Sequence, residues 1–203
     1  MDAFELLKQL PDNSVDLVLT DPPYGITACE WDKPIDFKEL WKELKRVGKE
    51  NCSFVFTASQ PFTTDLINSN REMFKYELIW EKSKATGHAI SKIRPMKAHE
   101  NIIIFLIGKG TYNPQKTEGK PYKSKLGKKE SIEMSTGNVR YDNRDGKRFP
   151  RTVQYFKTSE CERNGFPHPT HTSVTSGSLS TIFVSPHFIH TINRFILYHS
   201  KEL

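Results

Sequence analysis

A short apolar segment that ends at two consecutive prolines constrains this chain more than any other feature. Residues 15–20, VDLVLT, are apolar and largely β-branched or leucine, which predicts a strand buried in a parallel sheet. Asp21 is followed by Pro22 and Pro23. Because proline lacks a backbone N–H and restricts the residue before it, the strand has to end there. Ligands bind open α/β sheets at the carboxyl ends of the strands. We therefore expect residues 21–25 to form an exposed loop at a ligand-binding edge.

The remaining patterns predict helices alternating with strands. Apolar residues recur at helical spacing in three segments, 2–10, 36–49 and 61–70. Gly48 is expected to end the second of these helices. Short apolar or alternating runs predict further strands over residues 52–58, 74–80, 101–107 and 151–157. The order favours an α/β fold built on a largely parallel sheet, with the run at 101–107 buried on both faces.

Composition excludes several classes of protein. Of the 203 residues, 36% are hydrophobic and 11% aromatic, which is enough for a packed core. No stretch approaches the ~18 apolar residues of a membrane span. The first residues lack the basic-then-apolar layout of a secretory signal. Three widely spaced cysteines argue against a disulfide scaffold, so we expect a reducing, cytoplasmic setting.

Charge is distributed unevenly along the chain. The net charge is +6, but residues 1–50 hold 11 acidic and 7 basic side chains, whereas residues 109–151 hold 5 acidic and 12 basic ones. A basic stretch beside an acidic unit is typical of contact with a polyanion. A solvated lysine-rich loop explains the same pattern equally well, so charge alone leaves both interpretations open.

The segment LTDPPYG at residues 19–25 resembles the signature of amino-group DNA methyltransferases that depend on S-adenosylmethionine, in which Asp-Pro-Pro-Tyr follows a strand. Other segments match that family in the same order: 77–83 (ELIWEKS), 85–87 (ATG), 98–101 (AHEN), 112–114 (YNP), 149–151 (FPR) and 168–170 (HPT). The resemblance covers roughly residues 1–170. It implies a Rossmann-like methyltransferase sheet, mostly parallel and incomplete at the C-terminus.

The resemblance also implies the chemistry. Asp21 would accept one N–H of the exocyclic amino group of a base, and the carbonyl of Pro22 would accept the other. Pro23 would help to fix these acceptors, and Tyr24 would stack on the base after it is flipped out of the duplex. The aspartate form of the motif resembles adenine-N6 enzymes, with cytosine N4 as the alternative. The residues expected to contact S-adenosylmethionine are Asp21, His168, Pro169 and Thr170. The alternative is purely structural, namely that residues 21–24 form a proline-rich turn capping a strand.

The resemblance implies double-stranded DNA as partner and a restriction endonuclease in the same system. Residues 1–108 would be the catalytic part, 109–150 a basic insert for target recognition, and 151–170 a return to the core. The lysines expected to bind DNA are Lys82, Lys84, Lys120, Lys123, Lys125 and Lys128, with a solvated loop as the alternative for the first two. His99 and Glu100 are interpreted as a structural pair. Cys161, His168 and His171 lack the spacing of zinc ligands, so no metal is expected.

Residues 171–203 depart from the family pattern. The glycine-rich loop that would hold the cofactor is missing, and Gly177 is the single glycine after residue 170. We therefore hypothesise that this divergent tail is encoded out of frame or by a rearranged gene. On that hypothesis the sheet lacks strands beside residues 15–20, and the chain is an inactive remnant that at most binds DNA. Apolar residues late in the tail, including Phe195, Ile196 and Leu197, are expected to form a helix.

Overall fold

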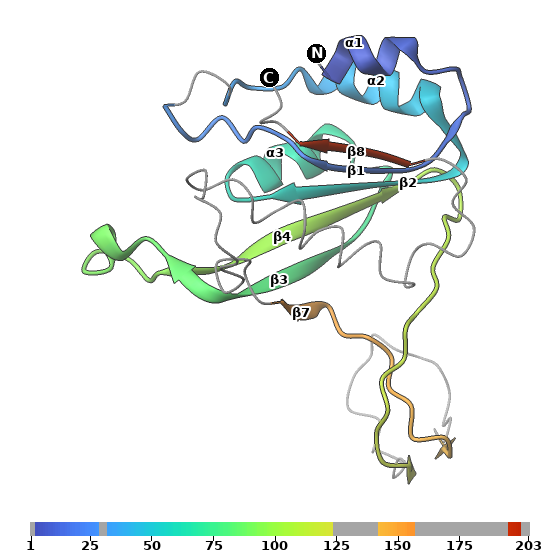
Figure 1. The fold of residues 1–203 in the computed structure, drawn as a ribbon, viewed down its shortest axis with the longest axis vertical. Helices are drawn as coiled ribbons and strands as arrows, with labels where there is room; N and C mark the ends of the chain where they lie inside the picture. The colour runs from blue at the N-terminus through green and yellow to red at the C-terminus, as the bar shows by residue number, and fades with distance from the viewer. Residues whose placement is uncertain (1–2, 29–31, 124–141, 157–194, 200–203) are drawn as a thin grey trace, which may run out of the picture. The chain divides into compact units, whose positions relative to one another are not determined.

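The computed structural model describes residues 3–28, 32–123, 142–156 and 195–199. The chain divides into two compact units, one formed by residues 1–113 with 152–203 and the other by residues 114–151. The first unit is built on a six-stranded sheet (Figure 1). Its strands, in spatial order, are β7 (Val153–Phe156), β3 (Phe74–Thr86), β4 (Lys97–Leu106), β2 (Gly48–Ala58), β1 (Val15–Asp21) and β8 (Phe195–His199).

Only β4 runs against its neighbours within this sheet. It is antiparallel to β2 and to β3, whereas β1 is parallel to both β2 and β8, and β3 is parallel to β7. The prediction of an α/β fold with a mostly parallel sheet is therefore confirmed. Because β4 is reversed, its first residues lie at the same edge of the sheet as the carboxyl ends of β1 and β2.

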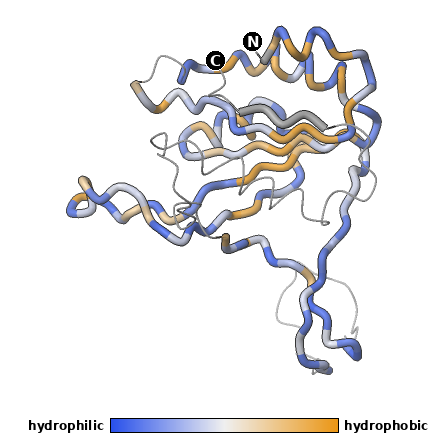
Figure 2. Tube along the Cα trace, viewed as in Figure 1, coloured by the Kyte–Doolittle hydropathy of each residue, from blue (hydrophilic) through white to orange (hydrophobic). Residues whose placement is uncertain are grey.

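Within the described residues, three helices cover one face of the sheet. They are α1 (Ala3–Gln9), α2 (Phe37–Val47) and α3 (Phe62–Ser69), close to the predicted positions; a short 3₁₀ turn, η1 (His88–Ile90), lies in the β3–β4 connection. Leu7, Leu44 and Leu66, one from each helix, share a core cluster with Phe54 and Phe105 of the sheet. Figure 2 shows the hydrophobic residues concentrated along the central strands beneath the helices. No helix within the described ranges is long and apolar enough to cross a membrane.

The central strands are buried on both faces, as predicted for residues 101–107. Ile103 and Phe105 of β4 face the helices, whereas Ile102 and Ile104 join Trp80 in a second cluster on the opposite face. All five side chains are fully buried. Burying a large apolar side chain is worth about 1.5–3 kcal/mol, so this strand is a major source of stability.

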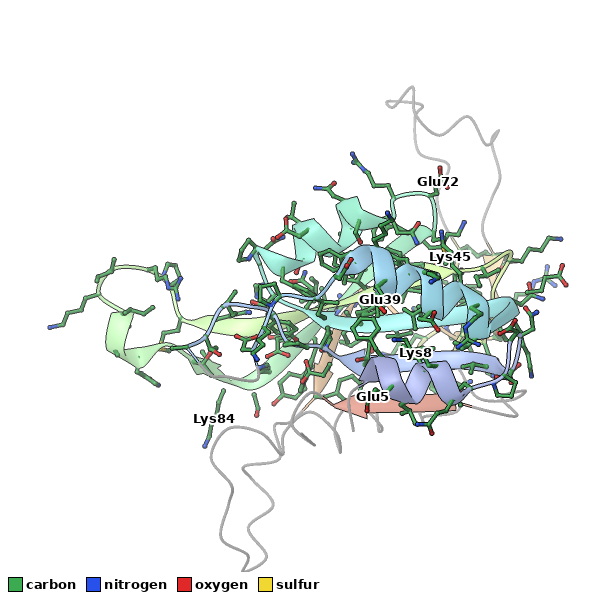
Figure 3. The ribbon with its side chains drawn as sticks, turned by 90° about the horizontal axis from the view of Figure 1, so that it is seen from above. Glu5, Lys8, Glu39, Lys45, Glu72 and Lys84 are labelled. Carbon is green, nitrogen blue, oxygen red and sulfur yellow. The ribbon has the colours of Figure 1, made fainter. Side chains whose placement is uncertain are left out.

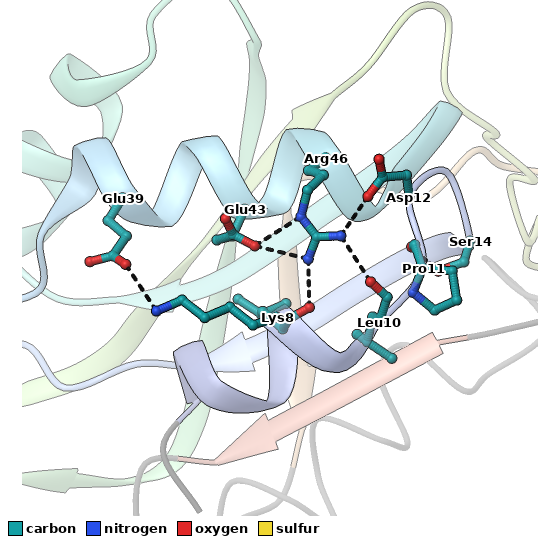
Figure 4. Close-up of polar contacts among 9 residues, drawn as sticks. Lys8, Leu10, Pro11, Asp12, Ser14, Glu39, Glu43 and Arg46 are labelled. Atoms are coloured by element: carbon teal, nitrogen blue, oxygen red, sulfur yellow. Dashed lines mark hydrogen bonds and ion pairs between the residues drawn. The ribbon is translucent and has the colours of Figure 1, made fainter.

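Arg46 fastens α1 to α2. Its guanidinium donates to the carbonyls of Leu7 (2.7 Å) and Leu10 (2.8 Å) and to the carboxylates of Asp12 (2.6 Å) and Glu43 (3.0 Å) (Figure 4). These carbonyls lie at the C-terminal end of α1, where backbone acceptors have no partner within the helix. The Leu7 carbonyl also accepts the backbone N–H of Leu10 (3.1 Å), so Arg46 adds a second donor at Leu7 and supplies one at Leu10.

Gly48 ends α2 as predicted, but the physical reason differs from the expected one. Its φ of −71° is open to any residue, so left-handed geometry is not what requires glycine here. A Cβ at this position would lie 2.9 Å from the Phe54 ring and 3.0 Å from the carbonyl of Leu44. Close packing where the chain passes directly from α2 into β2 therefore selects the residue.

Two expectations about the tail are wrong. Residues 195–199 form strand β8 rather than a helix, and β8 pairs in parallel with β1 over residues 17–21. The edge of β1 is therefore paired, contrary to what the out-of-frame hypothesis implies. The sequence FILYH suits a strand because aromatic and β-branched residues are enriched there. Residues 171–194 and 200–203, and with them the rest of that hypothesis, lie outside the described residues.

The second unit, residues 114–151, contains a short antiparallel ladder. Strand β5 (Tyr122–Lys123) pairs with β6 (Asp142–Asn143), and Thr117 and Arg148 exchange two backbone hydrogen bonds of 2.8 and 3.0 Å. Gly146 has a φ of +72°, and a Cβ there would meet the carbonyl of Gly119, so this crossing requires glycine at residue 146.

Candidate active site

The candidate site forms where β1 ends. Asp21 is the last residue of β1 and is half-buried, Pro22 is buried, and Pro23 and Tyr24 follow. Strand β2 runs parallel beside β1 and pairs Thr20 with Phe56. This register brings Thr57, fully buried near the end of β2, next to the carboxylate of Asp21. The two carboxyl ends therefore meet at one edge of the sheet.

Three oxygen atoms form a compact cluster there. Thr57 Oγ1 donates a short hydrogen bond to Asp21 Oδ1. The Tyr24 hydroxyl lies 2.8 Å from Asp21 Oδ1 and 2.9 Å from Thr57 Oγ1. Burial raises the pKa of Tyr24 well above its ordinary value, and the negative charges of Asp21 and Glu100 raise it further. The phenol is therefore a neutral hydrogen-bond donor beside the carboxylate.

The ring of Tyr24 packs on α3. It stacks on Phe62 with the ring centroids 5.2 Å apart and the planes 27° from parallel. Phe62 in turn touches Phe37 at the start of α2, with centroids 5.7 Å apart. One face of the Tyr24 ring is thus held by the aromatic core, while its hydroxyl faces Asp21.

A second carboxylate holds the loop that follows Tyr24. Asp32, 6% exposed, accepts backbone N–H groups from Gly25 (2.6 Å), Ile26 (2.9 Å) and Thr27 (2.6 Å). Burial raises the pKa of Asp32, but the hydrogen bonds from the Thr27 hydroxyl and these backbone groups outweigh it and leave the pKa below its ordinary value. Gly25 has a φ of +67°, so the turn begins at a residue suited to it.

Two lysines stand close to these groups. Lys82, near the end of β3, forms an ion pair with Glu100 of β4 in which both side chains are largely buried. Lys97, the first residue of β4, donates to the hydroxyl of Ser59 just beyond β2. Burial lowers the pKa of Lys97, the charge of Glu100 opposes this, and the neighbouring cations Lys82 and Arg94 add to it.

The predicted site residues differ in where the structure places them. Asp21, Pro22, Pro23 and Tyr24 lie together at the sheet edge, as just described. Lys82 is engaged by Glu100 and lies 5.2 Å from the Trp80 ring centroid, so binding a phosphate would require breaking an ion pair. The same contact means that Glu100 pairs with Lys82 rather than with His99, which is exposed.

Lys84 is exposed, and its side chain points away from the sheet (Figure 3). Lys120 and Lys123 belong to the second unit and are exposed. Five predicted residues lie outside the described residues: Lys125, Lys128, His168, Pro169 and Thr170. Of the cysteine–histidine group considered above, Cys161, His168 and His171 also lie outside them. Within the described part of the chain no cluster of His, Cys, Asp and Glu could hold a metal ion.

Sequence reasoning missed four residues of this region, namely Asp32, Thr57, Ser59 and Lys97. A signal existed for two of them. Thr57 and Ser59 are polar residues at the end of the strand that follows the DPPY strand, and parallel neighbours present their carboxyl ends at the same edge. For Asp32 the sequence offers no local sign that it turns back onto residues 25–27.

Known proteins share this architecture. A family model described as DNA methylase, covering N6 and N4 amino-group methyltransferases, matches residues 15–176. The chain belongs to this DNA methylase family.

Individual relatives are more distant. The chain is 25% identical over 99 residues to the type II methyltransferase M1.MboII of Moraxella bovis, an alignment that covers 44% of this chain and 38% of that protein. It therefore spans much less than two thirds of that curated relative. Its structure is similar to that of the PvuII DNA methyltransferase, described as cytosine-N4-specific, with a TM-score of 0.50 at 18% identity over 79% of this chain and 56% of that one. That likeness shows the fold. The M1.HpyAVI–SAM complex matches 60% of each chain at 23% identity and a TM-score of 0.45.

Proposed function

We propose that this chain transfers a methyl group from S-adenosylmethionine to an exocyclic amino group in double-stranded DNA, namely N6 of adenine. The observation that carries the proposal is the position of Asp21 and Pro22 where β1 meets β2 at the sheet edge. Membership of the DNA methylase family supports the reaction class. The Asp-Pro-Pro-Tyr form of the motif, rather than a structural comparison, favours adenine.

The residues at the edge suit an amino group that has to be activated. The lone pair of such a nitrogen is delocalised into the base, which makes it a poor nucleophile. Asp21 would accept one N–H and the carbonyl of Pro22 the other, turning the nitrogen toward a tetrahedral geometry. Neither Pro22 nor Pro23 has a backbone N–H to compete for these acceptors. As the N–C bond forms, the bond from the methyl carbon to sulfur would break and the nitrogen would have to lose one proton, which Asp21 would accept on this proposal.

The described residues fit the cofactor in one respect. The carboxylate of Asp21 is chemically suited to stand near a positive sulfonium, while His168, Pro169 and Thr170 remain proposed contacts outside the described residues. When bound, S-adenosylmethionine supplies a methyl group on sulfur that an aligned nucleophile can take. The contribution of the protein is to position the amino group, and alignment of this kind supplies a large part of such a rate enhancement.

The base has to leave the duplex to reach this edge. We propose that it stacks on Tyr24, as expected from the motif. Since Phe62 covers one face of the Tyr24 ring, the base would use the other face. The ring would then be sandwiched between the core and the base, and its orientation would be set in advance by the core.

The second unit is the proposed DNA contact. Within its described residues, Arg148 lies over the Tyr122 ring at 4.4 Å and Lys116 over the Phe149 ring at 4.3 Å, and both aromatic side chains are about half exposed. Surfaces that bind nucleic acid combine basic side chains, which neutralise phosphates, with aromatic rings, on which bases can stack. Lys120 and Lys123 of this unit would supply salt-sensitive affinity, and Lys84 of the first unit is a separate proposed DNA contact. A restriction endonuclease of the same system is the proposed biological partner.

The test is methyl transfer from labelled S-adenosylmethionine to unmethylated DNA, followed by hydrolysis and separation of the nucleosides. We expect label in N6-methyladenine and a loss of at least about 100-fold in Asp21→Asn, which keeps the size of the side chain but removes its charge. Asp36→Asn is the matched control, because Asp36 is an exposed carboxylate whose side chain accepts the N–H groups of Lys38 and Glu39 at the start of α2. Label in N4-methylcytosine would move the substrate to cytosine. No label, together with salt-dependent DNA binding, would favour the inactive remnant.

A further inference from the structure

The oxygen cluster at the sheet edge has three contacts of hydrogen-bond length but only two hydroxyl protons, those of Tyr24 and Thr57. Tyr24 Oη lies within hydrogen-bond distance of both Asp21 Oδ1 and Thr57 Oγ1, at 2.8 and 2.9 Å. A phenol has one proton, so it can donate to only one of these oxygens at a time. Thr57 Oγ1 donates its own proton to Asp21 Oδ1 and still has lone pairs to accept another. Two arrangements are therefore open to the same three atoms.

In the first arrangement, Tyr24 and Thr57 both donate to Asp21 Oδ1. In the second, Tyr24 donates to Thr57, which in turn donates to Asp21. The two differ by a small rotation of one hydroxyl hydrogen, and every donor keeps a partner in both. In the second arrangement, Asp21 Oδ1 accepts one hydrogen bond fewer from the protein.

We propose that Thr57 is a positioning residue that accepts the hydrogen bond of the Tyr24 phenol and so releases Asp21 Oδ1 to accept the amino N–H of the base. The inference rests on the proposed function and adds a role for a residue outside the DPPY motif. Thr57 is fully buried, so water does not offer the phenol an alternative acceptor at that position. The raised pKa of Tyr24 keeps the phenol protonated, so its hydroxyl has to donate a hydrogen bond to some acceptor.

The decisive variant is Thr57→Val, which keeps the branched shape and removes the hydroxyl. Tyr24 is then left with Asp21 as its acceptor, in competition with the base. We expect kcat for methyl transfer to fall about 10- to 100-fold, as for losing one hydrogen bond to a charged group, with KM for DNA changed less than about twofold. Thr57→Ser restores the hydroxyl, and its kcat should lie within about threefold of wild type.

Thr63→Val is the matched control. Thr63 is also a buried threonine, but its hydroxyl has no hydrogen-bond partner among the described residues. The same substitution there should leave kcat within about twofold of wild type. A loss in Thr57→Val equal to that in Thr63→Val would show a general response to removing a buried hydroxyl, and the proposal would be wrong.

Repeating the substitution in Tyr24→Phe separates two roles of Thr57, accepting the hydrogen bond of Tyr24 and donating its own hydrogen bond to Asp21. In Tyr24→Phe no phenol competes for the carboxylate, so adding Thr57→Val should cost less than about threefold more. Equal penalties with and without the phenol would mean that the two residues act independently, which overturns the proposal.

A readout without activity completes the test. Tyrosine labelled with ¹³C at Cζ reports the hydrogen bonding of each phenol, and Tyr24→Phe identifies the resonance of Tyr24. We expect this resonance to shift in Thr57→Val and to stay in place in Thr57→Ser; an unshifted resonance in the valine variant rejects the contact. Wild-type protein without methyl transfer would defeat the proposed function and this inference together. Active wild type with an equally active Thr57→Val would defeat the inference alone.

Discussion

Replacing Asp32 by asparagine tests whether one buried carboxylate holds the loop that follows the DPPY motif. Asp32 Oδ1 accepts from Gly25, and Oδ2 accepts from both Ile26 and Thr27. An asparagine has one oxygen and one NH₂ group, so at least one of these three N–H groups would face another donor. A hydrogen bond to a charged group is worth about 1.5–3 kcal/mol, and a buried donor left without a partner is costly. We therefore expect Asp32→Asn to lower the free energy of unfolding by about 1.5–3 kcal/mol at pH 7.

The difference in unfolding free energy between wild type and Asp32→Asn should shrink at low pH. Hydrogen bonds hold the folded-state pKa of Asp32 below its ordinary value, whereas the unfolded carboxyl titrates near pH 4. Stability from Asp32 is then fully present above about pH 4 and is lost as the pH falls through the folded-state pKa. Asparagine does not titrate. Urea unfolding of both proteins should show a constant difference between pH 7 and about pH 5, and a shrinking one below about pH 4.

The control is Asp36→Asn, which makes the same substitution at an exposed carboxylate. Asp36 caps α2 by accepting from the N–H groups of Lys38 (2.8 Å) and Glu39 (3.2 Å), and asparagine is about as good a helix cap as aspartate. Its effect should stay below about 0.5 kcal/mol. If the two variants were equally destabilised, or if the effect of Asp32→Asn persisted unchanged at low pH, the structural reasoning would be refuted.

Three further predictions concern the core, a buried thiol and the second unit. Phe105→Ala should reduce the free energy of unfolding by about 3–5 kcal/mol, because Phe105 is fully buried against Trp41 (ring centroids 4.7 Å apart); denaturant unfolding measures this. Burial raises the pKa of the Cys52 thiol to about 12, so iodoacetamide at pH 8 should leave Cys52 unmodified in the folded protein and alkylate it in urea, as peptide mapping would show. Lys120→Ala and Lys123→Ala should each reduce the slope of log binding constant for DNA against log salt by about 0.9, without changing which sequence is preferred.

Features set by adjacent residues could be predicted from the sequence. The end of β1 follows from Pro22 and Pro23, because the missing N–H groups and restricted backbone act where they stand. The face-alternating burial of Ile102 to Phe105 also follows from a continuous apolar run. The position of the candidate site at the sheet edge thus required no knowledge of the remaining chain.

Features that depend on pairing between distant segments could not be predicted in the same way. Thr57 meets Asp21 across 36 positions of sequence through the parallel register of β1 and β2. A shift of one residue would turn the hydroxyl to the opposite face of the sheet. The strand at residues 195–199 illustrates a second limit, because a short apolar run has no period that separates a strand from a buried helix. Its pairing with β1, and not its own pattern, decides the outcome.

The two carboxylates beside Tyr24 differ in the kind of donor that each one meets, and this difference separates binding chemistry from structure. Asp32 accepts a hydrogen bond from the Thr27 hydroxyl, but its other three donors are backbone N–H groups, whose protons cannot be redirected without moving the loop. Asp21 instead receives hydroxyl groups from Thr57 and Tyr24, whose protons turn about single bonds while the heavy atoms stay in place. A carboxylate that must exchange a protein partner for a substrate needs donors of the second kind. The fold therefore gives mostly fixed backbone donors to the residue that holds the loop, and the rotatable hydroxyl donors of Thr57 and Tyr24 to the residue proposed to hold the base.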